Sequence, residues 1–374
     1  MTLTSAASPG QVITFWGSGL GASPQDSDSA HTTTPHPVSV SGLPLLVLIG
    51  GIPAPILYQG RSGYPGVDQV NVMVPQGVSP GCAVSVVAVN SNYQVVSNVV
   101  TLPIAAGGGA CTDPVMGITA QQIASLSAKT NVSIGLVVLQ EQNFGLFTPG
   151  AAQADFVTMP ESSLAPWLAG QTMNFSIGLS PQVSLGSCVA TSGSPVFWAP
   201  LLPTLDAGAM TFTGPAGTRA MPELAGPPAE YLLQLGFTDG LWNPLTGGKY
   251  TFGAAGGKDV GAFTAVLNFP IQENFAMPDI QISASGQKIT WTGGSAGQFL
   301  TISGANQSSS FACNVAATAG QFTIPSYVLV PLGGGTGTLS VQVSTYPQPV
   351  SASGLDAAFA FGYVIPQTAN VTYY

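Results

Sequence analysis

The apolar residues of this chain are grouped in short runs, and no other feature restricts its possible folds as strongly. The runs are rich in β-branched and aromatic residues and end at Gly, Pro, Asn or Ser. Runs of about four to eight such residues between turn formers are typical of β-strands. In residues 68–74 the valines alternate with polar residues, which predicts one buried and one solvated strand face. The sequence therefore predicts an all-β protein.

The N-terminal part contains enough strand-like runs for one Ig-like sandwich. These runs lie at 11–16, 45–49, 55–58, 68–74, 82–89 and 95–104. Residues 90–94 are expected to form a hairpin loop between two valine-rich strands. Residues 105–110 are rich in Gly and Ala and indicate a linker, so the first domain is expected to span residues 1–105.

The rest of the chain is expected to form two more β-rich domains. Thr119 and Gln122 match a capping box, which predicts one short helix near 119–128 in a middle domain over 106–272. Strand-like runs follow at 132–139, 173–179, 188–190, 196–198, 209–213, 230–236, 249–252 and 260–269. Alternating runs in residues 273–374 predict a C-terminal Ig-like sandwich. The expected architecture is thus a tandem of Ig-like or β-sandwich domains with one short helix.

Charged residues are scarce, since Asp, Glu, Lys and Arg make up 6% of the 374 residues, where about 25% is usual. With 6 Lys and Arg against 15 Asp and Glu, the net charge is −9. The chain therefore offers no basic surface for nucleic acid or anionic lipid. Its solvated faces must be built from Ser, Thr, Asn, Gln and Gly, and copies with such surfaces repel one another only weakly.

The four cysteines, Cys82, Cys111, Cys188 and Cys313, stand far apart and do not form the spacing of a metal site. Their even number predicts disulfides and an oxidising compartment. Cys82 begins one strand of a predicted hairpin and Cys111 follows the other, so antiparallel pairing would bring these two together. Cys188 and Cys313 are then paired by elimination, which would tie the middle region to the last domain.

The sequence contains no uncharged apolar run long enough to span a membrane. Its first residues lack the basic and apolar regions of a secretory signal. We therefore expect that the signal of an exported protein would lie upstream of Met1.

Four motifs in the N-terminal part resemble the uncharacterised C-terminal domain family found in secreted proteins of Solibacter-type soil bacteria. They are PGQVITFWGSGLG (9–21), IGGIPAPILYQG (49–60), SGYPGVDQVNVMVP (62–75) and SNVVTLPI (97–104). The match covers about residues 5–105, and the runs at 205–218, 258–265, 289–304 and 311–325 resemble regions that often follow this domain. The resemblance implies an IPT/TIG-like Ig fold and an extracellular location, and it implies no activity.

The stretch GSGLGA, residues 17–22, fits the dinucleotide-binding pattern G-x-G-x-x-A. That pattern needs a helix directly after the glycines, whose N-terminus holds the pyrophosphate. Residues 23–37 are instead rich in turn formers and β-branched residues. The strand is therefore expected to end in a loop, and the family resemblance implies that Gly17, Gly19 and Gly21 form a structural bend there.

Other candidate reaction centres have weak support. Residues 293–297, GGSAG, fit the hydrolase elbow G-x-S-x-G, but strand-like runs on both sides predict a hairpin turn. Four loop residues could bind a cation but match no standard site, namely Asp26, Asp28, His31 and His36. A carboxylate pair for glycoside hydrolysis could come from Glu141, Asp155, Asp206, Glu223, Glu230, Asp239 and Asp259. We expect no catalytic, cofactor-binding or metal-binding residue.

The five tryptophans, Trp16, Trp167, Trp198, Trp242 and Trp291, could supply an aromatic surface for sugars. Trp16 and Trp291 lie in strand-like runs and are expected to be internal. Trp242 lies in a turn-rich segment, so it is the candidate glycan contact.

These observations favour a secreted, non-enzymatic structural or adhesive protein of the cell surface. Its partners would be further copies of the chain or other extracellular surface proteins, in a filament or layer. The strand at 370–374 could extend a neighbour's sheet through Val371, Tyr373 and Tyr374, unless it closes its own sheet. The alternative is a carbohydrate-binding or accessory module of an extracellular polysaccharide-acting system. A hydrolase with a carboxylate pair is the third hypothesis.

Overall fold

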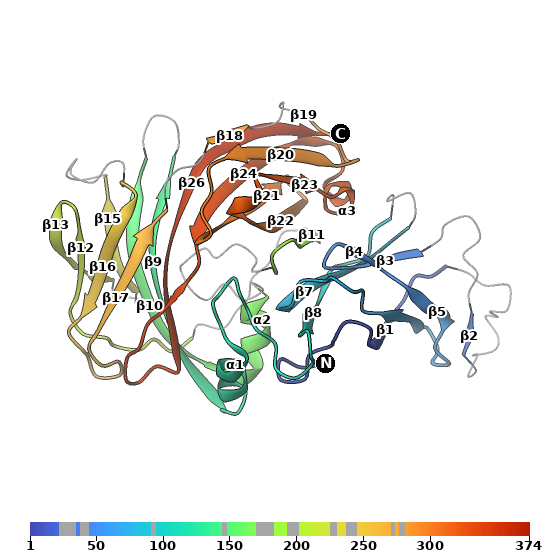
Figure 1. Cartoon of the computed structure of the whole chain (residues 1–374), viewed down its shortest axis with the longest axis horizontal. Coiled ribbons are helices and arrows are strands. Elements are labelled where there is room, and N and C mark those ends of the chain that lie inside the picture. The colour runs from blue at the N-terminus through green and yellow to red at the C-terminus, as the bar shows by residue number, and fades with distance from the viewer. Residues whose placement is uncertain are drawn as a thin grey trace.

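The computed structural model shows an all-β architecture with several sheets (Figure 1). The structure describes residues 1–21, 35–37, 45–90, 95–143, 148–169, 183–192, 202–224, 230–236, 245–270, 274–276 and 281–374. The predicted fold class is confirmed. The strands expected at 173–179 and 196–198 lie outside the described residues, as does most of the loop at 90–94.

The helices of the described residues are short. Helix α1 (Ala120–Leu126) is the predicted one, because the Thr119 hydroxyl accepts the backbone N–H of Gln122 and the Gln122 side chain accepts that of Thr119. The prediction of a single helix is wrong, since α2 (Leu164–Leu168) and α3 (Ser326–Leu329) are also present. At 5 and 4 residues, they are too short to show a helical period in the sequence.

The N-terminal part is a two-layer sandwich. One sheet has the order β1 (Val12–Gly17), β6 (Asp68–Met73), β5 (Ile56–Arg61), β2 (His36–Pro37), and the other β4 (Ile52–Ala54), β3 (Leu45–Ile49), β7 (Gly81–Asn90), β8 (Val100–Ile104). Ile13 and Val72 of the first sheet share a buried cluster with Ile49, Val84 and Leu102 of the second. The alternating valines of β6 thus point towards this core.

The N-terminal sandwich also packs against the rest of the molecule. Leu48, Val87 and Val89 point away from its own core and belong to the same buried cluster as Tyr327 and Leu329 of α3. Because β7 is covered on both faces, nearly all of its residues are buried. This explains why its sequence is a continuous apolar run rather than an alternating one.

The remaining strands are organised around one 11-stranded sheet. Its main path is β11 (Cys188–Ser192), β22 (Ser309–Ala316), β21 (Gln298–Ala305), β24 (Gly335–Thr345), β26 (Ala357–Tyr373), β9 (Asn131–Gln142), β10 (Gly150–Pro160), β15 (Glu230–Leu235) and β14 (Glu223–Leu224). The short strands β19 (Gln281–Ile282) and β25 (Gln348–Pro349) also pair with β26.

Two smaller sheets cover the two halves of this sheet. The sheet β13 (Gly217–Met221), β12 (Met210–Gly214), β16 (Gly248–Ala254), β17 (Phe263–Phe269) packs on β9 and β10. The sheet β18 (Asn274–Ala276), β20 (Gln287–Thr292), β23 (Gln321–Ile324) packs on β21, β22 and β24. Phe156 and Phe263 meet edge to face in the first sandwich, with ring centroids 5.7 Å apart. Trp291 is buried in the second.

Strand β26 belongs to both of these sandwiches (Figure 1). Residues 357–365 run parallel to β9, and the following residues up to Tyr373 run antiparallel to β24. The domain boundary expected after residue 272 falls between β17 and β18. Strands from both sides of it share one sheet, so the middle and C-terminal segments form one connected β structure.

The structure contradicts the edge-strand role expected for Val371, Tyr373 and Tyr374. At its end, β26 pairs with β24 on one side and with β19 on the other. Val371 and Tyr373 are buried. The backbone of Tyr374 bonds to Ile282 and Ala284, although its side chain is exposed. The strand closes its own sheet.

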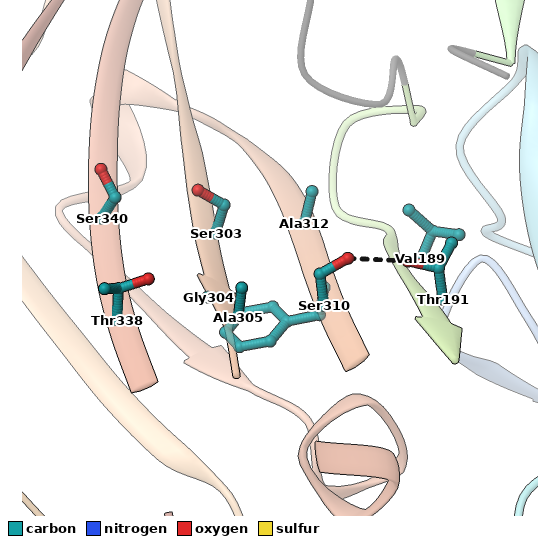
Figure 2. Close-up of a pocket in the computed structure, with 10 residues that line it drawn as sticks. Val189, Thr191, Ser303, Gly304, Ala305, Ser310, Ala312, Thr338 and Ser340 are labelled. Atoms are coloured by element: carbon teal, nitrogen blue, oxygen red, sulfur yellow. Dashed lines mark hydrogen bonds between the residues drawn. The ribbon is translucent and has the colours of Figure 1, made fainter. Parts of the chain in front are cut away.

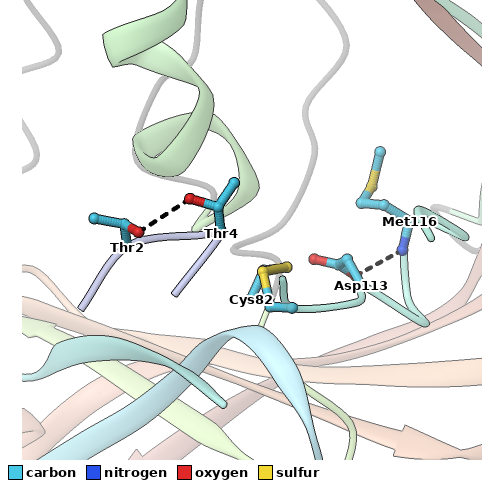
Figure 3. The surroundings of a disulfide bond; sticks show 6 residues. Thr2, Thr4, Cys82, Asp113 and Met116 are labelled. Carbon is cyan, nitrogen blue, oxygen red and sulfur yellow. Dashed lines mark hydrogen bonds between the residues drawn. A yellow bond between two sulfur atoms is a disulfide. The ribbon is translucent and has the colours of Figure 1, made fainter. Parts of the chain in front are cut away.

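The first disulfide joins Cys82 at the start of β7 to Cys111, and its two Cα atoms are 5.2 Å apart (Figure 3). Both cysteines are buried in the cluster that α1 and α2 form over the second face of β9 and β26. The disulfide therefore attaches the N-terminal sandwich to the helical cover of the next one. The hairpin of β7 and β8 brings the two cysteines together, as the sequence predicts.

Replacing Cys82 and Cys111 by alanine should lower the free energy of unfolding by about 3–4 kcal/mol, because the bridge closes a long loop of the unfolded chain. Urea denaturation followed by tryptophan fluorescence would measure the difference. A reductant should lower the stability of both proteins, because it breaks both disulfides of the wild type and the Cys188–Cys313 disulfide of the double variant. Equal stability of the two oxidised proteins would contradict this prediction.

A buried carboxylate lies beside this disulfide. Asp113 is buried, and its Oδ1 accepts the backbone N–H of Met116 at 2.9 Å (Figure 3). Burial raises the pKa of Asp113 from 3.8 to about 6, against the lowering effect of its backbone hydrogen bonds. The folded state therefore holds this proton more tightly than the unfolded state. The resulting stabilisation is complete below pH 3.8 and is lost as the pH rises through about 6.

The stability advantage of the wild type over Asp113→Asn should therefore shrink as the pH rises from about 4 to 7, by roughly 2 kcal/mol. Asparagine cannot ionise, so the variant lacks this part of the pH dependence. Urea denaturation at a series of pH values would measure it. A constant difference between the two proteins would show that Asp113 titrates normally in the folded state.

Candidate functional site

The candidate site is a field of small side chains on the outer face of the eleven-stranded sheet (Figure 2). A shallow groove of about 190 Å³ crosses strands β11, β22, β21 and β24 there. We call the side chains of Val189, Thr191, Ser303, Ala305, Ser310, Ala312, Thr338 and Ser340 the Ser/Thr face. Every second residue of a strand points to the same side, which is how these positions come to share one face.

The strand register places these side chains next to one another. Ser303 of β21 lies opposite Ala312 of β22 and Ser340 of β24. In the adjacent row, Thr191 lies opposite Ser310, and their hydroxyl oxygens are 2.7 Å apart. Short side chains in register give a smooth surface on which hydroxyl groups both donate and accept.

The Ser/Thr face continues onto β26. The hydroxyl oxygens of Ser340 and Thr368 are 3.2 Å apart, and Thr368, Asn370 and Thr372 are exposed on the same strand. The uncharged surface thus extends over five neighbouring strands. The sequence carries the signal for it, since small polar residues recur at every second position of these runs, but only the register shows that the runs are neighbours.

At the other end of the face the polar side chains are buried and satisfied. The Thr301 hydroxyl donates to Asn314 Oδ1 at 2.8 Å, and Asn314 Nδ2 donates to the carbonyl oxygen of Val183 at 2.7 Å. Asn314 therefore holds the segment before β11 against the sheet.

The second disulfide supports the edge of the same region. Cys188 of β11 and Cys313 of β22 lie directly opposite each other, with Cα atoms 4.1 Å apart. Both are buried on the core side of the sheet. The bridge spans 125 positions of sequence, and it ties β11 to the C-terminal sandwich as the pairing by elimination predicts.

The side chains that line the groove are uncharged and, apart from one buried ring, small. None of the described residues that line it is charged or a histidine. A serine or threonine hydroxyl becomes a nucleophile when a neighbouring base takes its proton, and the lining residues offer hydroxyls, methyl groups and one buried ring instead.

Two of the carboxylates considered for hydrolysis lie together in the middle sandwich. Gln153 Nε2 is 3.4 Å from Asp155 Oδ2 and donates to Glu230 Oε2 at 3.1 Å. Glu230 lines a pocket of about 330 Å³ beside several glutamines, whereas Asp155 is buried below it and does not line it. The structure thus brings Asp155 and Glu230 to one amide group, and Glu230 lines the pocket together with Glu141, another of these carboxylates.

Other carboxylates of that group bind backbone N–H groups. Asp206 accepts the backbone N–H groups of Lys258 and Gly208, and these bonds lower the pKa of its carboxyl. Asp259 accepts the N–H of Asp206, and buried Glu141 accepts that of Leu245. These three carboxylates therefore fix turns and loops. Glu223 is exposed in β14, and Asp239 lies outside the described residues.

Gly19 and Gly21 of GSGLGA form the expected bend, whereas Gly17 still belongs to the strand. Gly19 and Gly21 have φ of 105° and 87°, and Gly17 ends β1 as extended backbone. The N–H of Leu20 donates to Asp68 Oδ2 at 2.8 Å. A carboxylate of the protein thus occupies a backbone N–H that a dinucleotide site would turn towards phosphate.

The prediction of a hairpin at residues 293–297 is wrong. This segment connects β20 and β21, which belong to different sheets, so it is an arch between two layers. Gly294 has φ of 88°, and a Cβ there would be 2.3 Å from the carbonyl oxygen of Ala317. The glycine is needed for this close approach. Ser295 is exposed and its N–H bonds to Gln298 Oε1.

The tryptophans divide between core and surface. Trp167 and Trp291 are buried. Trp16 was expected to be internal, but it is 56% exposed, because the alternation of β1 places Ile13 rather than Trp16 on the core side. The candidate glycan contact Trp242 lies outside the described residues, as does Trp198.

The described residues contain no group of three or more His, Cys, Asp or Glu side chains that could hold a metal ion. Of the proposed cation loop, Asp26, Asp28 and His31 lie outside the described residues, and the backbone of His36 pairs with Arg61 of β5. Within the described part of the chain, no helix has the length and apolar character needed to cross a membrane.

No protein-family model matches the chain, and no curated protein matches it in sequence. Among solved structures, one similar chain comes from a study described as structural insight into host cell surface retention of a 1.5-MDa bacterial ice-binding adhesin. It is 10% identical, and the alignment covers 96% of this chain and 92% of that chain with a TM-score of 0.14. A likeness at this level does not establish a common fold.

Replacing Asn314 by alanine should lower the free energy of unfolding by about 1–3 kcal/mol, because the buried carbonyl of Val183 and hydroxyl of Thr301 lose their partner. Thr338→Ala on the exposed part of the same face is the control and should change stability by less than about 0.5 kcal/mol. Urea denaturation would compare the two variants. Equal effects would show that the Asn314 bonds are exchanged for water at no cost.

Proposed function

We propose that this chain is an extracellular, non-enzymatic structural or adhesive protein whose copies contact one another through the Ser/Thr face. The observation that carries the proposal is the composition of that face, which offers hydroxyl and methyl groups on neighbouring strands and no charged residue in its groove. Removing charged groups from water is costly, whereas small hydroxyls can exchange water for hydrogen bonds across an interface. A surface of this kind is suited to close contact.

Two further observations support this function. All four cysteines form disulfides, which is typical of proteins in an oxidising compartment such as the cell exterior. The described sandwiches are connected by β26, by the Cys82–Cys111 disulfide and by a continuous buried cluster. Such a connected structure would carry mechanical load without separating into independent domains.

The partners in this proposal are further copies of the chain or other extracellular surface proteins. The net charge of −9 opposes binding to nucleic acid. The family resemblance of residues 5–105 is part of the proposal, because it implies the same extracellular location.

Light scattering of the purified protein at micromolar concentrations should show masses above that of the monomer, 37.8 kDa. Thr338→Lys should shift the protein towards the monomer, because a buried ammonium group in the contact is costly to desolvate. Val266→Lys is the matched control, since Val266 is exposed on the outer side of β17 in another sheet. A wild type that stays monomeric, or equal effects of the two lysines, would refute this mode of contact.

A further inference from the structure

We infer that Trp16 and Tyr64, together with Gln69 and Asn71, form a binding site for a neutral polysaccharide chain on the N-terminal sandwich. We call these four residues the aromatic corner. This inference deepens the proposed function, because it gives an adhesive protein a class of ligand. Its test is separate, since self-association reports on the Ser/Thr face and glycan binding reports on the aromatic corner.

The two rings form an open angle at the surface. Trp16 is 56% and Tyr64 67% exposed. Their ring centroids are 6.1 Å apart and their planes meet at 68°. Single exposed aromatic residues are common, but two large exposed rings in contact form a patch that is costly to leave in water. We take this patch as the surface that a ligand would cover.

The backbone that carries the two rings is fixed by hydrogen bonds. Tyr64 lies in the tight turn between β5 and β6, where Ser62 accepts its N–H at 3.1 Å and Val67 bonds to its carbonyl. Trp16 is paired with Gln69 in the sheet. The loop after Trp16 is tied down by the bond from the Leu20 N–H to Asp68. A fixed site loses little conformational entropy on binding.

Amide groups lie next to the rings on the same outer face. Asn71 Oδ1 accepts bonds from the Thr14 hydroxyl and from Gln69 Nε2, both at 2.9 Å. These bonds fix the two amides side by side. In the described part of the chain, no other partner binds Asn71 Nδ2 or Gln69 Oε1. A donor and an acceptor therefore remain for hydroxyl groups of a ligand.

The charges near the aromatic corner are directed inward. Arg61 and Asp68 form an ion pair, and Arg61 also donates to the carbonyl oxygen of Gly21 at 2.6 Å. Their side chains are only 19% and 7% exposed. The surface that remains consists of aromatic rings, amides and a hydroxyl, which favours an uncharged ligand.

A sugar residue matches this combination of groups. Its axial C–H groups form an apolar face that stacks on an aromatic ring, and its equatorial hydroxyls form hydrogen bonds at the rim with amides. The two rings meet edge to face at 68°, so their exposed faces are not coplanar. A flat crystalline polysaccharide surface would require coplanar rings, so the aromatic corner should bind a soluble single chain.

Binding would be measured by titration calorimetry with soluble neutral polysaccharides that a glycan array identifies as bound by the full chain. Trp16→Ala and Tyr64→Ala should each lower the affinity by about tenfold or more, because each removes a stacking surface. Trp16→Phe, which keeps a ring, should restore much of the loss. Tyr374→Ala removes an aromatic side chain that is 64% exposed elsewhere, and it should leave the affinity unchanged.

Tyr64→Ala changes only an exposed turn residue, so it tests the inference even if Trp16→Ala were to fold poorly. An array on which the full chain binds no neutral glycan would overturn the inference. Binding that survives both alanine substitutions would overturn it too, as would binding to crystalline polysaccharide in preference to soluble chains. A wild type that binds neutral glycan but stays monomeric would instead refute the proposed contact through the Ser/Thr face and leave the aromatic corner in place.

Discussion

The backbone hydrogen bonds along both edges of β26 hold the structure together. This strand of 17 residues supplies a layer to two sandwiches, pairing with β9 in one and with β24 in the other. Its first half is buried between the β12–β17 sheet on one side and the cover of α1 and α2 on the other. Each sandwich would present an open sheet edge without it, and such edges pair with other chains.

The few charged residues reinforce these junctions. Asp356, directly before β26, accepts the N–H of Ser133 at 2.9 Å and pairs with Lys129 at 3.0 Å. The pair formed by Arg61 and Asp68 likewise fixes the loop after β1. Many of the charges seen in the structure thus connect segments of the chain to one another. The outer faces are left to hydroxyl, amide and aromatic groups, which is why both proposed contact surfaces are neutral.

The sequence predicts most strands with alternating or β-branched patterns, and it misses elements whose surroundings remove those patterns. Strand β10 is rich in alanine and buried on both faces, so it shows no alternation. The same holds for the first half of β26. Strands from both sides of residue 272 share one sheet, and the sequence does not reveal this because parallel pairing between distant strands leaves no local signal. The disulfides were predictable, since an even set of isolated cysteines limits their pairing.

The sites were less accessible to sequence reasoning than the fold. The hydroxyl residues of the Ser/Thr face come from strands far apart in the sequence, and only the register aligns them. The exposure of Trp16 depends on which phase of the alternation in β1 faces the core. A shift by one residue reverses that choice, so composition and spacing do not determine it.

The pairing of β9 with β26 sets a condition on how the chain can acquire its structure during synthesis. The bond between Ser133 and Asp356 joins positions 223 residues apart, so strand β9 leaves the ribosome long before its neighbour exists. The central sheet cannot be completed segment by segment, and contacts of such high sequence separation form slowly. The central layer can therefore form only after the C-terminal strand β26 has been made.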